Sequence, residues 1–370
     1  MKTAPELVAD LLVAAGIQPN GSDATDIRIK DQRFYNRVLK EGSLGLGESY
    51  MDGWWDCDKL DELIFKLLSA NLHQNVKPAG SWFRYKITDL LFNRQTKRRA
   101  RKVARIHYNL GNDLFEQMLG KQMMYSCGYW ANASNLDEAQ EHKLELICRK
   151  LKLEPGMEVL DIGCGWGGFA QYAASKYLVK VTGITISAEQ AKLAQQRCVS
   201  LPVSIKLEDY RDLNGEYDRI VSIGMFEHVG LKNYRAYMKK VRQLLRKDGL
   251  FLLHTIGSAD SSPTDPWIDR YIFPNGQIPS PAQLSAAFEP ELILHDWHCF
   301  GKDYDRTVLA WRGHFQNSWP KLRDAYGDTF YRMWMYYLNV CAASFRAGKN
   351  SLWQLVFSRP GYNADYRSVR

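Results

Sequence analysis

The chain has 370 residues, 45% of them apolar, so it can form one large domain or two ordinary ones with full cores. It has no apolar run of about 18 residues and no leader pattern, so we expect neither a membrane span nor a signal peptide. Its seven cysteines are scattered, which indicates a reducing compartment and argues against a disulfide framework or a structural zinc site. A net charge of +8 favours an anionic partner, either nucleic acid or a membrane surface.

Residues 1–90 are expected to be mainly helical, from the apolar spacing of Leu7, Leu11, Leu12 and Ala15. This zone contains the glycine-rich stretch "EGSLGLGESYMDGWW". No strong strand precedes it and no Lys-Ser or Lys-Thr pair follows it, as a phosphate loop would require. We therefore interpret the stretch as a turn-rich packing motif.

The stretch "RQTKRRARKVAR", residues 94–105, carries seven basic residues and no acidic one. One interpretation is a solvated linker or helix face, as most such stretches are. The other is a contact with a membrane surface, where each basic residue near anionic lipid contributes roughly 1 kcal/mol.

From residue 106 onward, apolar strand patterns alternate with helical ones, which predicts an α/β fold with a parallel, doubly wound sheet. One of the helices is expected to begin at an N-cap, Ser187, with Glu189 in its first turn. The strands are predicted at residues 158–163, 180–186, 203–208, 219–224, 250–256, 292–298 and 305–312.

The segment "VLDIGCGWGGFAQYAA" has the order strand, glycine turn, helix. Gly163, Gly165 and Gly168 satisfy the dinucleotide pattern GxGxxG, but the acidic residue expected about 20 positions later is missing. Instead, Asp161 precedes the first glycine, and Gly163, Gly165 and Gly167 fit GxGxG. This arrangement favours S-adenosylmethionine, with the glycines close to its methionine part and the acid near its ammonium.

The segment "EDYRD" follows the third predicted strand. Asp209 and Tyr210 would then lie at the carboxyl ends of the strands, where a doubly wound fold places an adenine. A plain polar loop is an equally good interpretation of these residues.

Several polar side chains follow other predicted strands. Glu227 and His228 follow the fourth strand, and His254 lies at the end of the fifth. Each could be a satisfied core residue, and a zinc site made of Cys127, Glu227 and His254 is chemically acceptable but weakly supported by the spacing. The remaining polar candidates are Tyr125, Ser126, Tyr304 and Asp305.

Taken together, the motifs resemble those of the cyclopropane-fatty-acyl-phospholipid synthases, within the wider mycolic acid cyclopropane synthase family. They occur in the family's order over nearly the whole chain, and the amino-terminal part resembles the phospholipid enzymes. The motifs are "GSLGLGESYMDGWW", "HYNLGNDLF", "YSCGYW", "VLDIGCGWGG", "GITIS", "EDYRDL", "GMFEHVG", "LLHTIGS" and "YIFPNG".

This resemblance implies a class I S-adenosylmethionine-dependent methyltransferase fold, Rossmann-like, with a small helical amino-terminal domain. The implied reaction adds the donor's methyl group across a cis double bond of a phospholipid acyl chain and gives a cyclopropane ring and S-adenosylhomocysteine. The resemblance also implies a bound bicarbonate, and its implied holders are Cys127, Glu227, His254, the backbone at Ile256, and Tyr304. The residues expected to line the donor are Tyr125, Ser126, Asp161, Gly163, Gly165, Gly167, Thr185, Gln190, Asp209 and Tyr210.

In that chemistry Glu227 has a definite use. Closing the ring requires removal of a proton from a carbocation, and a weak but well-placed base is enough. Bicarbonate has an O–H group from which Glu227 can accept a hydrogen bond. His254 and the phenol of Tyr304 can donate hydrogen bonds to its oxygens. The alternatives are a lipid methyltransferase that makes a methyl or methylene branch, a silent lipid-binding protein, and a nucleic-acid methyltransferase.

We expect three zones along the chain: a helical, lipid-docking domain at 1–90, a basic linker at 91–105 and a catalytic domain at 106–370. The segment 330–345 either lines an acyl channel or is plain core. The expected partners are unsaturated phospholipids of an anionic bilayer and a second copy in a homodimer, with no nucleic acid and no metal ion. We expect a cytoplasmic enzyme, peripheral at the inner membrane surface.

Overall fold

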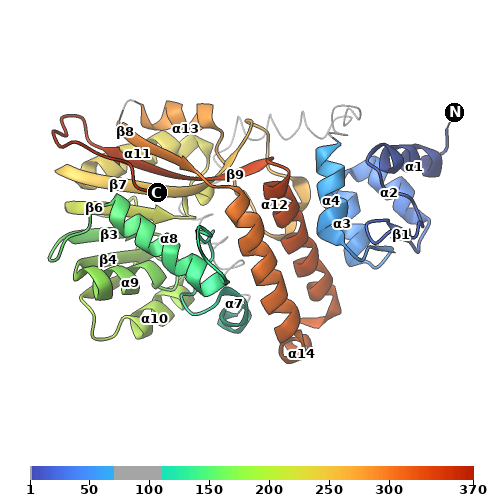
Figure 1. Ribbon diagram of the computed structural model, residues 1–370, viewed down its shortest axis with the longest axis horizontal. Helices are drawn as coiled ribbons and strands as arrows, with labels where there is room; N and C mark the ends of the chain where they lie inside the picture. Colours follow the sequence, from blue (N-terminus) through green and yellow to red (C-terminus); the bar gives the residue numbers. More distant parts are fainter. Residues whose placement is uncertain (1, 71–110, 290) are drawn as a thin grey trace. The chain divides into compact units, whose positions relative to one another are not determined.

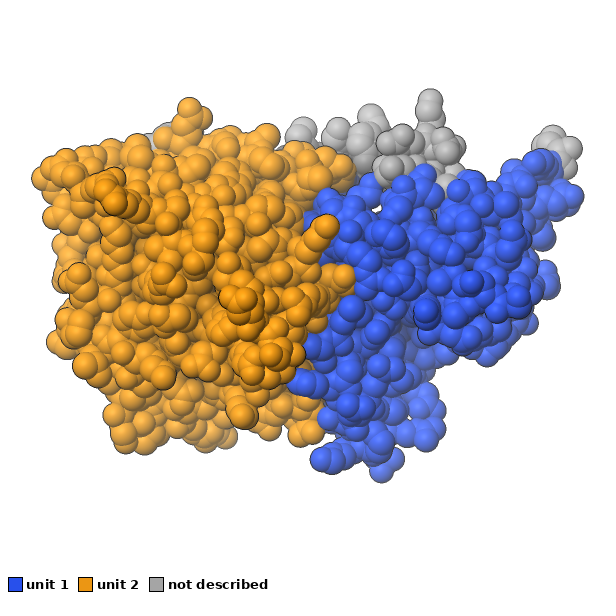
Figure 2. Space-filling model, viewed as in Figure 1, with its two compact units in different colours: residues 1–92, 263–274, 308–350 blue, residues 93–262, 275–307, 351–370 orange. Residues whose placement is uncertain are grey.

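The computed structural model describes residues 2–70, 111–289 and 291–370. Within them, one compact unit comprises 2–70, 263–274 and 308–350, and the other comprises 111–262, 275–307 and 351–370 (Figure 2). The basic stretch and the domain boundaries predicted at residues 90 and 105 lie outside the described residues, so this division of the chain stays a prediction. The helical unit includes two later segments that the sequence analysis placed in the catalytic domain.

The first unit is mainly helical, as expected for the amino-terminal zone. The stretch 43–51, which we expected to be rich in turns, is helical. Its glycines do serve packing, because a Cβ on Gly47 would lie 2.4 Å from the Trp267 ring and one on Gly45 would lie 2.5 Å from the Arg37 carbonyl. The elements of this unit are α1 (Ala4–Ala14), β1 (Arg28–Ile29), α2 (Arg33–Glu41), α3 (Ser43–Met51), β2 (Trp55–Asp56), α4 (Leu60–Ser69), α12 (Pro266–Tyr271) and most of α14 (Lys302–Arg346).

Part-buried ion pairs explain why the late segment packs with the amino-terminal helices. Arg312 and Arg346 of α14 donate to opposite oxygens of Asp61 on α4, each at 2.9 Å. Arg332 donates to the Tyr50 carbonyl and to Asp56. These pairs connect residues about 250 or more positions apart, so the sequence pattern could not indicate them.

The second unit is built on a seven-stranded sheet of order β5-β4-β3-β6-β7-β9-β8 (Figure 1). Neighbours β5, β4, β3, β6 and β7 pair in parallel, whereas β8 and β9 pair antiparallel. The strands are β3 (Glu158–Ile162), β4 (Lys180–Thr185), β5 (Val203–Leu207), β6 (Tyr217–Ile223), β7 (Leu245–Ser258), β8 (Ile293–Cys299) and β9 (Asn350–Ser358). The helices are α7 (Asn112–Leu119), α8 (Leu136–Lys150), α9 (Gly168–Tyr177), α10 (Ala188–Arg197), α11 (Tyr234–Leu244) and α13 (Pro281–Phe288), with 3₁₀ turns η2 (Phe226–His228) and η3 (Leu231–Asn233).

Six of the predicted strands are confirmed, and the seventh is wrong. Residues 305–312 are helical and belong to the start of α14. The β-branched pair Thr307 and Val308 favoured a strand, but Asp303 and Asp305 in the first turn are well placed for a helix amino terminus. The seventh strand is β9. The predicted N-cap is confirmed, since Ser187 Oγ accepts from the Gln190 N–H at 3.3 Å.

The two faces of the sheet carry different cores. Helices α8 and α9 pack on one face with Val159, Val221 and Leu252, while α11 and α13 pack on the other with Leu160 and Phe251 (Figure 1). Because side chains alternate along a strand, every second residue faces α8. This places Asp161 on β3, His254 on β7 and Gln354 on β9 on the α8 face.

Within the described ranges, no helix combines the length and the apolar character needed to cross a membrane.

Candidate active site

The glycine turn lies between β3 and α9, at the carboxyl end of the sheet. Gly163, Gly165 and Gly167 all have positive φ angles, which glycine adopts without strain. A Cβ on Gly163 would lie 2.7 Å from Met225, and one on Gly167 would lie 3.1 Å from Ala194, so these two glycines are needed for packing. A Cβ on Gly165 would meet no atom within 4 Å, so this glycine borders open space among the described residues.

Asp161 is a buried carboxylate directly before this turn. It is 1% exposed, and its Oδ2 has no hydrogen-bond partner among the described residues. Burial raises the pKa of Asp161 to about 7, against the opposing effect of the Lys143 charge. A carboxylate kept this dry is costly unless a cationic group completes the site.

The segment containing Tyr125 and Ser126 is held against the same end of the sheet. The Phe115 ring of α7 contacts both Tyr125, at 5.2 Å between ring centroids, and Trp166 of the glycine turn, at 4.9 Å. A Cβ on Gly224, just after β6, would lie 3.7 Å from Ser126 Cβ. This position lies between the ends of β3 and β6, where the strand order reverses and ligands bind in such folds.

Two further residues that were predicted to line the methyl donor contact each other at the end of β4. Thr185 Oγ1 donates to Gln190 Oε1 at 2.9 Å, and both side chains are buried. After β5, the carboxylate of Asp209 accepts from Arg211 through Nε at 2.7 Å and Nη2 at 2.6 Å. Tyr210 contacts the Tyr237 ring edge-on, and burial raises the pKa of Tyr210 to about 12, so its phenol is neutral.

Glu227 lies in the 3₁₀ turn η2 after β6 and is 8% exposed. Its Oε1 accepts from the Ile256 backbone N–H at 2.7 Å, so two residues predicted to hold the same ion are in direct contact. Its Oε2 is buried and has no hydrogen-bond partner among the described residues. Burial raises the pKa of Glu227 to about 7, and the Ile256 N–H opposes that shift.

His254 lies on β7, opposite Ile223 of β6, and is fully buried. The Gln354 side-chain amide is 3.2 Å from His254 Nδ1, while Nε2 has no partner among the described residues. Burial lowers the pKa of His254 far below its ordinary value, and the charges of Lys143 and Lys150 add to the shift. The imidazole is therefore neutral, and an amide that donates to Nδ1 leaves the proton on Nε2.

Cys127 and Tyr304 belong to two segments that are joined by hydrogen bonds. Thr307 Oγ1 accepts from the Gly128 backbone N–H at 3.0 Å, and Asp303 accepts from the Trp130 backbone N–H at 2.7 Å. Cys127 is fully buried, and burial raises the pKa of its thiol, so it is a thiol rather than a nucleophilic thiolate. Tyr304 is 8% exposed, in the first turn of α14.

Three polar side chains at this site were not predicted from the sequence. Gln140 and Lys143 of α8 donate to Ser126, Gln140 to the carbonyl and Lys143 to the hydroxyl, each at 2.9 Å. Gln354 is the third, on the strand that was not predicted. A signal did exist for the first two, because the helical spacing from Leu136 places residues 140 and 143 on the buried face of α8.

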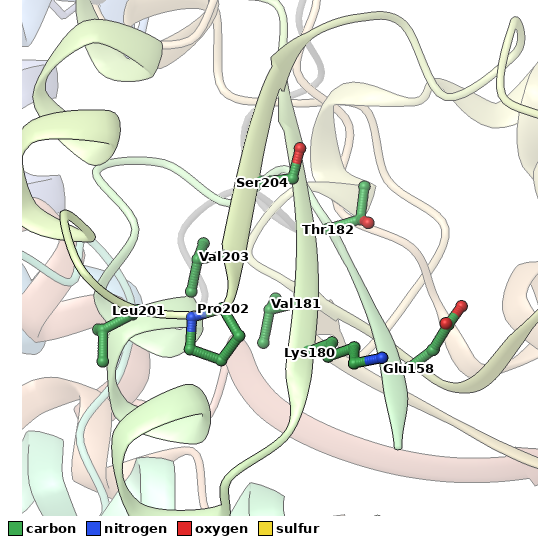
Figure 3. Close-up of a pocket in the computed structure, with 8 residues that line it drawn as sticks. All are labelled: Glu158, Lys180, Val181, Thr182, Leu201, Pro202, Val203 and Ser204. Atoms are coloured by element: carbon green, nitrogen blue, oxygen red, sulfur yellow. The ribbon is translucent and has the colours of Figure 1, made fainter. Parts of the chain in front are cut away.

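The hollow drawn in Figure 3 lies elsewhere. It has a volume of about 440 Å³, and its lining includes Glu158, Lys180 and Val203, which are the first residues of β3, β4 and β5. The residues predicted to line the methyl donor lie at or after the opposite, carboxyl ends of these strands. Within the described residues, no group of three or more His, Cys, Asp or Glu side chains is arranged to hold a metal ion.

Comparison with known proteins gives the family. The model of the mycolic acid cyclopropane synthetase family matches residues 95–355. The chain belongs to this family. It is 56% identical over 352 residues to the cyclopropane-fatty-acyl-phospholipid synthase of Escherichia coli K12, covering 95% of this chain and 92% of that protein.

Two further known proteins are similar to this cyclopropane synthetase family member. It is 37% identical over 364 residues to a probable fatty acid methyltransferase of Pseudomonas putida, covering 92% of this chain and 88% of that one. The solved structure of the mycolic acid cyclopropane synthase CmaA1, complexed with SAH and CTAB, matches with a TM-score of 0.66 and 30% identity, covering 70% of this chain and 98% of that one. The chain is an enzyme of the methyltransferase family, and its class I Rossmann-like fold with a helical amino-terminal region is confirmed.

Proposed function

We propose that the chain transfers the methyl group of S-adenosylmethionine to the cis double bond of an acyl chain in a membrane phospholipid, forming a cyclopropane ring. The 56% identity to a cyclopropane-fatty-acyl-phospholipid synthase over nearly the whole chain supports this reaction. The structural similarity to a cyclopropane synthase that binds SAH supports the donor.

The residues around the glycine turn fit this donor. Asp161 offers an unpartnered carboxylate oxygen to the donor's ammonium, and Gly165, in the turn that follows, borders open space. Thr185 ends β4, Gln190 lies in the first turn of α10, and Tyr210 follows β5, at the edge of the sheet where the adenosine part would lie. The donor would supply an electrophilic methyl group, and its transfer to an alkene leaves a carbocation on the acyl chain.

The observation that carries the reaction type is the pair of buried, unpartnered atoms Glu227 Oε2 and His254 Nε2. One is an acceptor and the other a neutral imidazole nitrogen; Glu227 follows β6, and His254 lies on the neighbouring strand β7. This chemistry fits bicarbonate, which would supply the base that removes the proton when the ring closes. Glu227 would accept a hydrogen bond from its O–H, His254 and Tyr304 would donate to its oxygens, and Cys127 and the Ile256 backbone would complete the site.

The chain's own residues also protect the reaction from water. Glu227, His254 and Cys127 are each at most 8% exposed, so the ion is held in a low-dielectric site. Phe226 is fully buried, but its ring is stacked on Tyr234 at 4.3 Å, so one ring face is already covered.

A second candidate function is a lipid methyltransferase that makes a methyl or methylene branch from the same cation. The similarity to a probable fatty acid methyltransferase, at 37% identity, is the reason to retain it. The two functions differ in where the proton is removed, and therefore in the structure of the lipid product.

The bicarbonate site can be tested directly. We expect turnover on unsaturated phosphatidylglycerol vesicles to fall at least about tenfold in carbonate-depleted buffer and to return when bicarbonate is added at fixed pH. The affinity for S-adenosylhomocysteine, measured by calorimetry in the same buffers, should not change. Full turnover without bicarbonate would leave Glu227 as a structural acid.

The donor site predicts a specific effect at Gly165. Gly165→Ala places a methyl group in the open space at the glycine turn, and we expect affinity for S-adenosylhomocysteine to fall at least about tenfold. Gly156→Ala is the matched control, because Gly156 also has a positive φ and open space for a Cβ but lies before β3. Equal affinities in the two folded variants would contradict the donor assignment.

The proposed partner is an anionic bilayer, which the enzyme meets at the inner membrane surface as a cytoplasmic, peripheral homodimer. The basic stretch 94–105 supports this part of the proposal through its sequence alone. Changing Arg98, Arg99, Arg101 and Lys102 to Gln should weaken binding to phosphatidylglycerol vesicles at least about tenfold at low salt. Flotation measures it, and unchanged flotation, with donor affinity intact, would reduce the stretch to a solvated face.

A further inference from the structure

A buried lysine lies beside the predicted donor residues without a role so far. Lys143 of α8 is fully buried, and its Nζ donates to Ser126 Oγ at 2.9 Å. Its charge also acts on Asp161, Cys127 and His254. A lysine is almost never fully buried without an anionic partner, so its position requires a reason.

The hydrogen bond from Lys143 determines where the Ser126 hydrogen points. Burial lowers the pKa of Lys143 to about 7, and the carboxylate of a bound ligand would favour its charged form. That ammonium can only donate, so Ser126 Oγ is the acceptor and keeps its own hydrogen for another acceptor. No acceptor for that hydrogen lies within hydrogen-bond distance in the part of the chain that the structure describes. The Ser126 carbonyl is fixed separately, by Gln140.

This hydroxyl lies where the strand order reverses. Ser126 is next to Gly224, and the following residue, Met225, packs against Gly163 of the glycine turn. Asp161, with its unpartnered Oδ2, lies on β3 on the same face of the sheet as α8. The site therefore has a cation-supported O–H donor and a carboxylate acceptor within one layer.

These two groups have the charges that an α-amino acid requires. A carboxylate accepts from an O–H group polarised by an ammonium, and an α-ammonium donates to a buried carboxylate. We propose that Lys143 is a positioning residue for the methyl donor, which directs the Ser126 hydroxyl to the carboxylate of the donor's amino-acid part. The inference rests on the proposed function, because it needs the donor at the glycine turn.

A pair of ligands isolates the carboxylate. S-adenosylhomocysteine and its decarboxylated analogue S-adenosyl-3-thiopropylamine share the adenosine, the thioether and the amine. We expect the parent enzyme to bind S-adenosylhomocysteine about ten- to a hundredfold more tightly by calorimetry, since hydrogen bonds to charged groups are strong. In Lys143→Met this ratio should fall below about threefold, with the loss confined to S-adenosylhomocysteine.

Two variants separate positioning from a structural role. Ser126→Ala should reduce the ratio as Lys143→Met does, and the double variant should reduce it no further, because both remove the same interaction. Lys150→Met is the matched control: Lys150 is equally buried on α8 but pairs with Asp296 at 3.2 Å, so the ratio should stay at the parent value.

Several results would overturn the inference. Lys143→Met could lower the affinity for both ligands equally, which would give Lys143 a structural role. It could also keep the parent's affinity ratio while changing the bicarbonate dependence of turnover. If Lys143→Met does not fold, an unchanged ratio in Ser126→Ala overturns the inference by itself. A parent enzyme that binds neither ligand would defeat the proposed function, which is a distinguishable outcome.

Discussion

Glu227→Gln is expected to lower turnover on phospholipid vesicles about a hundredfold, as for the loss of a positioned acid–base group. Glutamine keeps the shape and can still accept from the Ile256 N–H, but it removes the charge that receives the O–H of bicarbonate. Affinity for S-adenosylhomocysteine should change less than about threefold, because the hydrogen bonds of Glu227 within the described residues go to Ile256 and Gln277, neither of which is predicted to line the methyl donor. Initial rates and calorimetry on the same protein samples measure both quantities.

The same substitution should have the opposite effect on stability. Burial raises the pKa of Glu227 from 4.5 to about 7, so the native carboxyl holds its proton more tightly than the unfolded one. The parent therefore loses folding stability as the pH rises from 4.5 to 7, because the unfolded state gives up this proton more easily than the native state. Glu227→Gln removes this loss. The gain in unfolding free energy, variant minus parent, should be about 2 kcal/mol larger at pH 8 than at pH 5 by urea denaturation.

Glu291→Gln is the matched control for both measurements. Glu291 is also 8% exposed, but it pairs with Arg242 at 3.3 Å, away from the candidate site. It should leave turnover at the parent value. If Glu227→Gln lost turnover and stability together at pH 8, Glu227 would be a structural acid.

Asp296→Ala is expected to destabilise the enzyme by about 3–5 kcal/mol, because it leaves a buried charge without its partner. Lys150 is fully buried and lies 3.2 Å from Asp296, whose carboxylate also accepts from Arg370 through Nη1 and Nη2 at 2.7 Å each. Burial lowers the pKa of Lys150 to about 8 even with Asp296 present. Urea denaturation at pH 7 measures the loss.

A double variant tests the cause of that loss. Lys150→Met together with Asp296→Leu removes both charges, and Arg370 is exposed enough to be solvated alone. The double variant should recover most of the stability that Asp296→Ala loses. A double variant as unstable as Asp296→Ala would show that packing at β8, rather than the unpaired lysine, sets the cost.

The strands that carry the site could be predicted because their signal is local. Apolar runs at β3, β4, β5, β6 and β7 end in polar residues, and parallel strands bring their carboxyl ends to one edge of the sheet. This places Asp161, Glu227 and His254 in one region, and the structure shows the Glu227–Ile256 contact directly. The roles assigned to these residues stay predictions until the variants are measured.

Other features depend on contacts between distant residues, and the sequence pattern missed them. Gln354 reaches His254 from β9, 100 positions away, and Thr307 reaches Gly128 across 179 positions. The start of α14 was predicted as a strand because β-branched residues outweighed its first-turn acids. Lys143 was missed because a charged residue on an otherwise apolar helix face is usually assigned to solvent.

The structure of the lipid product tests the central claim most directly. The enzyme is incubated with vesicles of an unsaturated phosphatidylglycerol and S-adenosylmethionine labelled with ¹³C in its methyl group, and the extracted lipid is examined by proton and carbon NMR. We predict that the label appears in the methylene carbon of a cyclopropane ring on an intact phospholipid. Label in a methyl or exocyclic methylene branch, or no label in lipid, would contradict the proposed function.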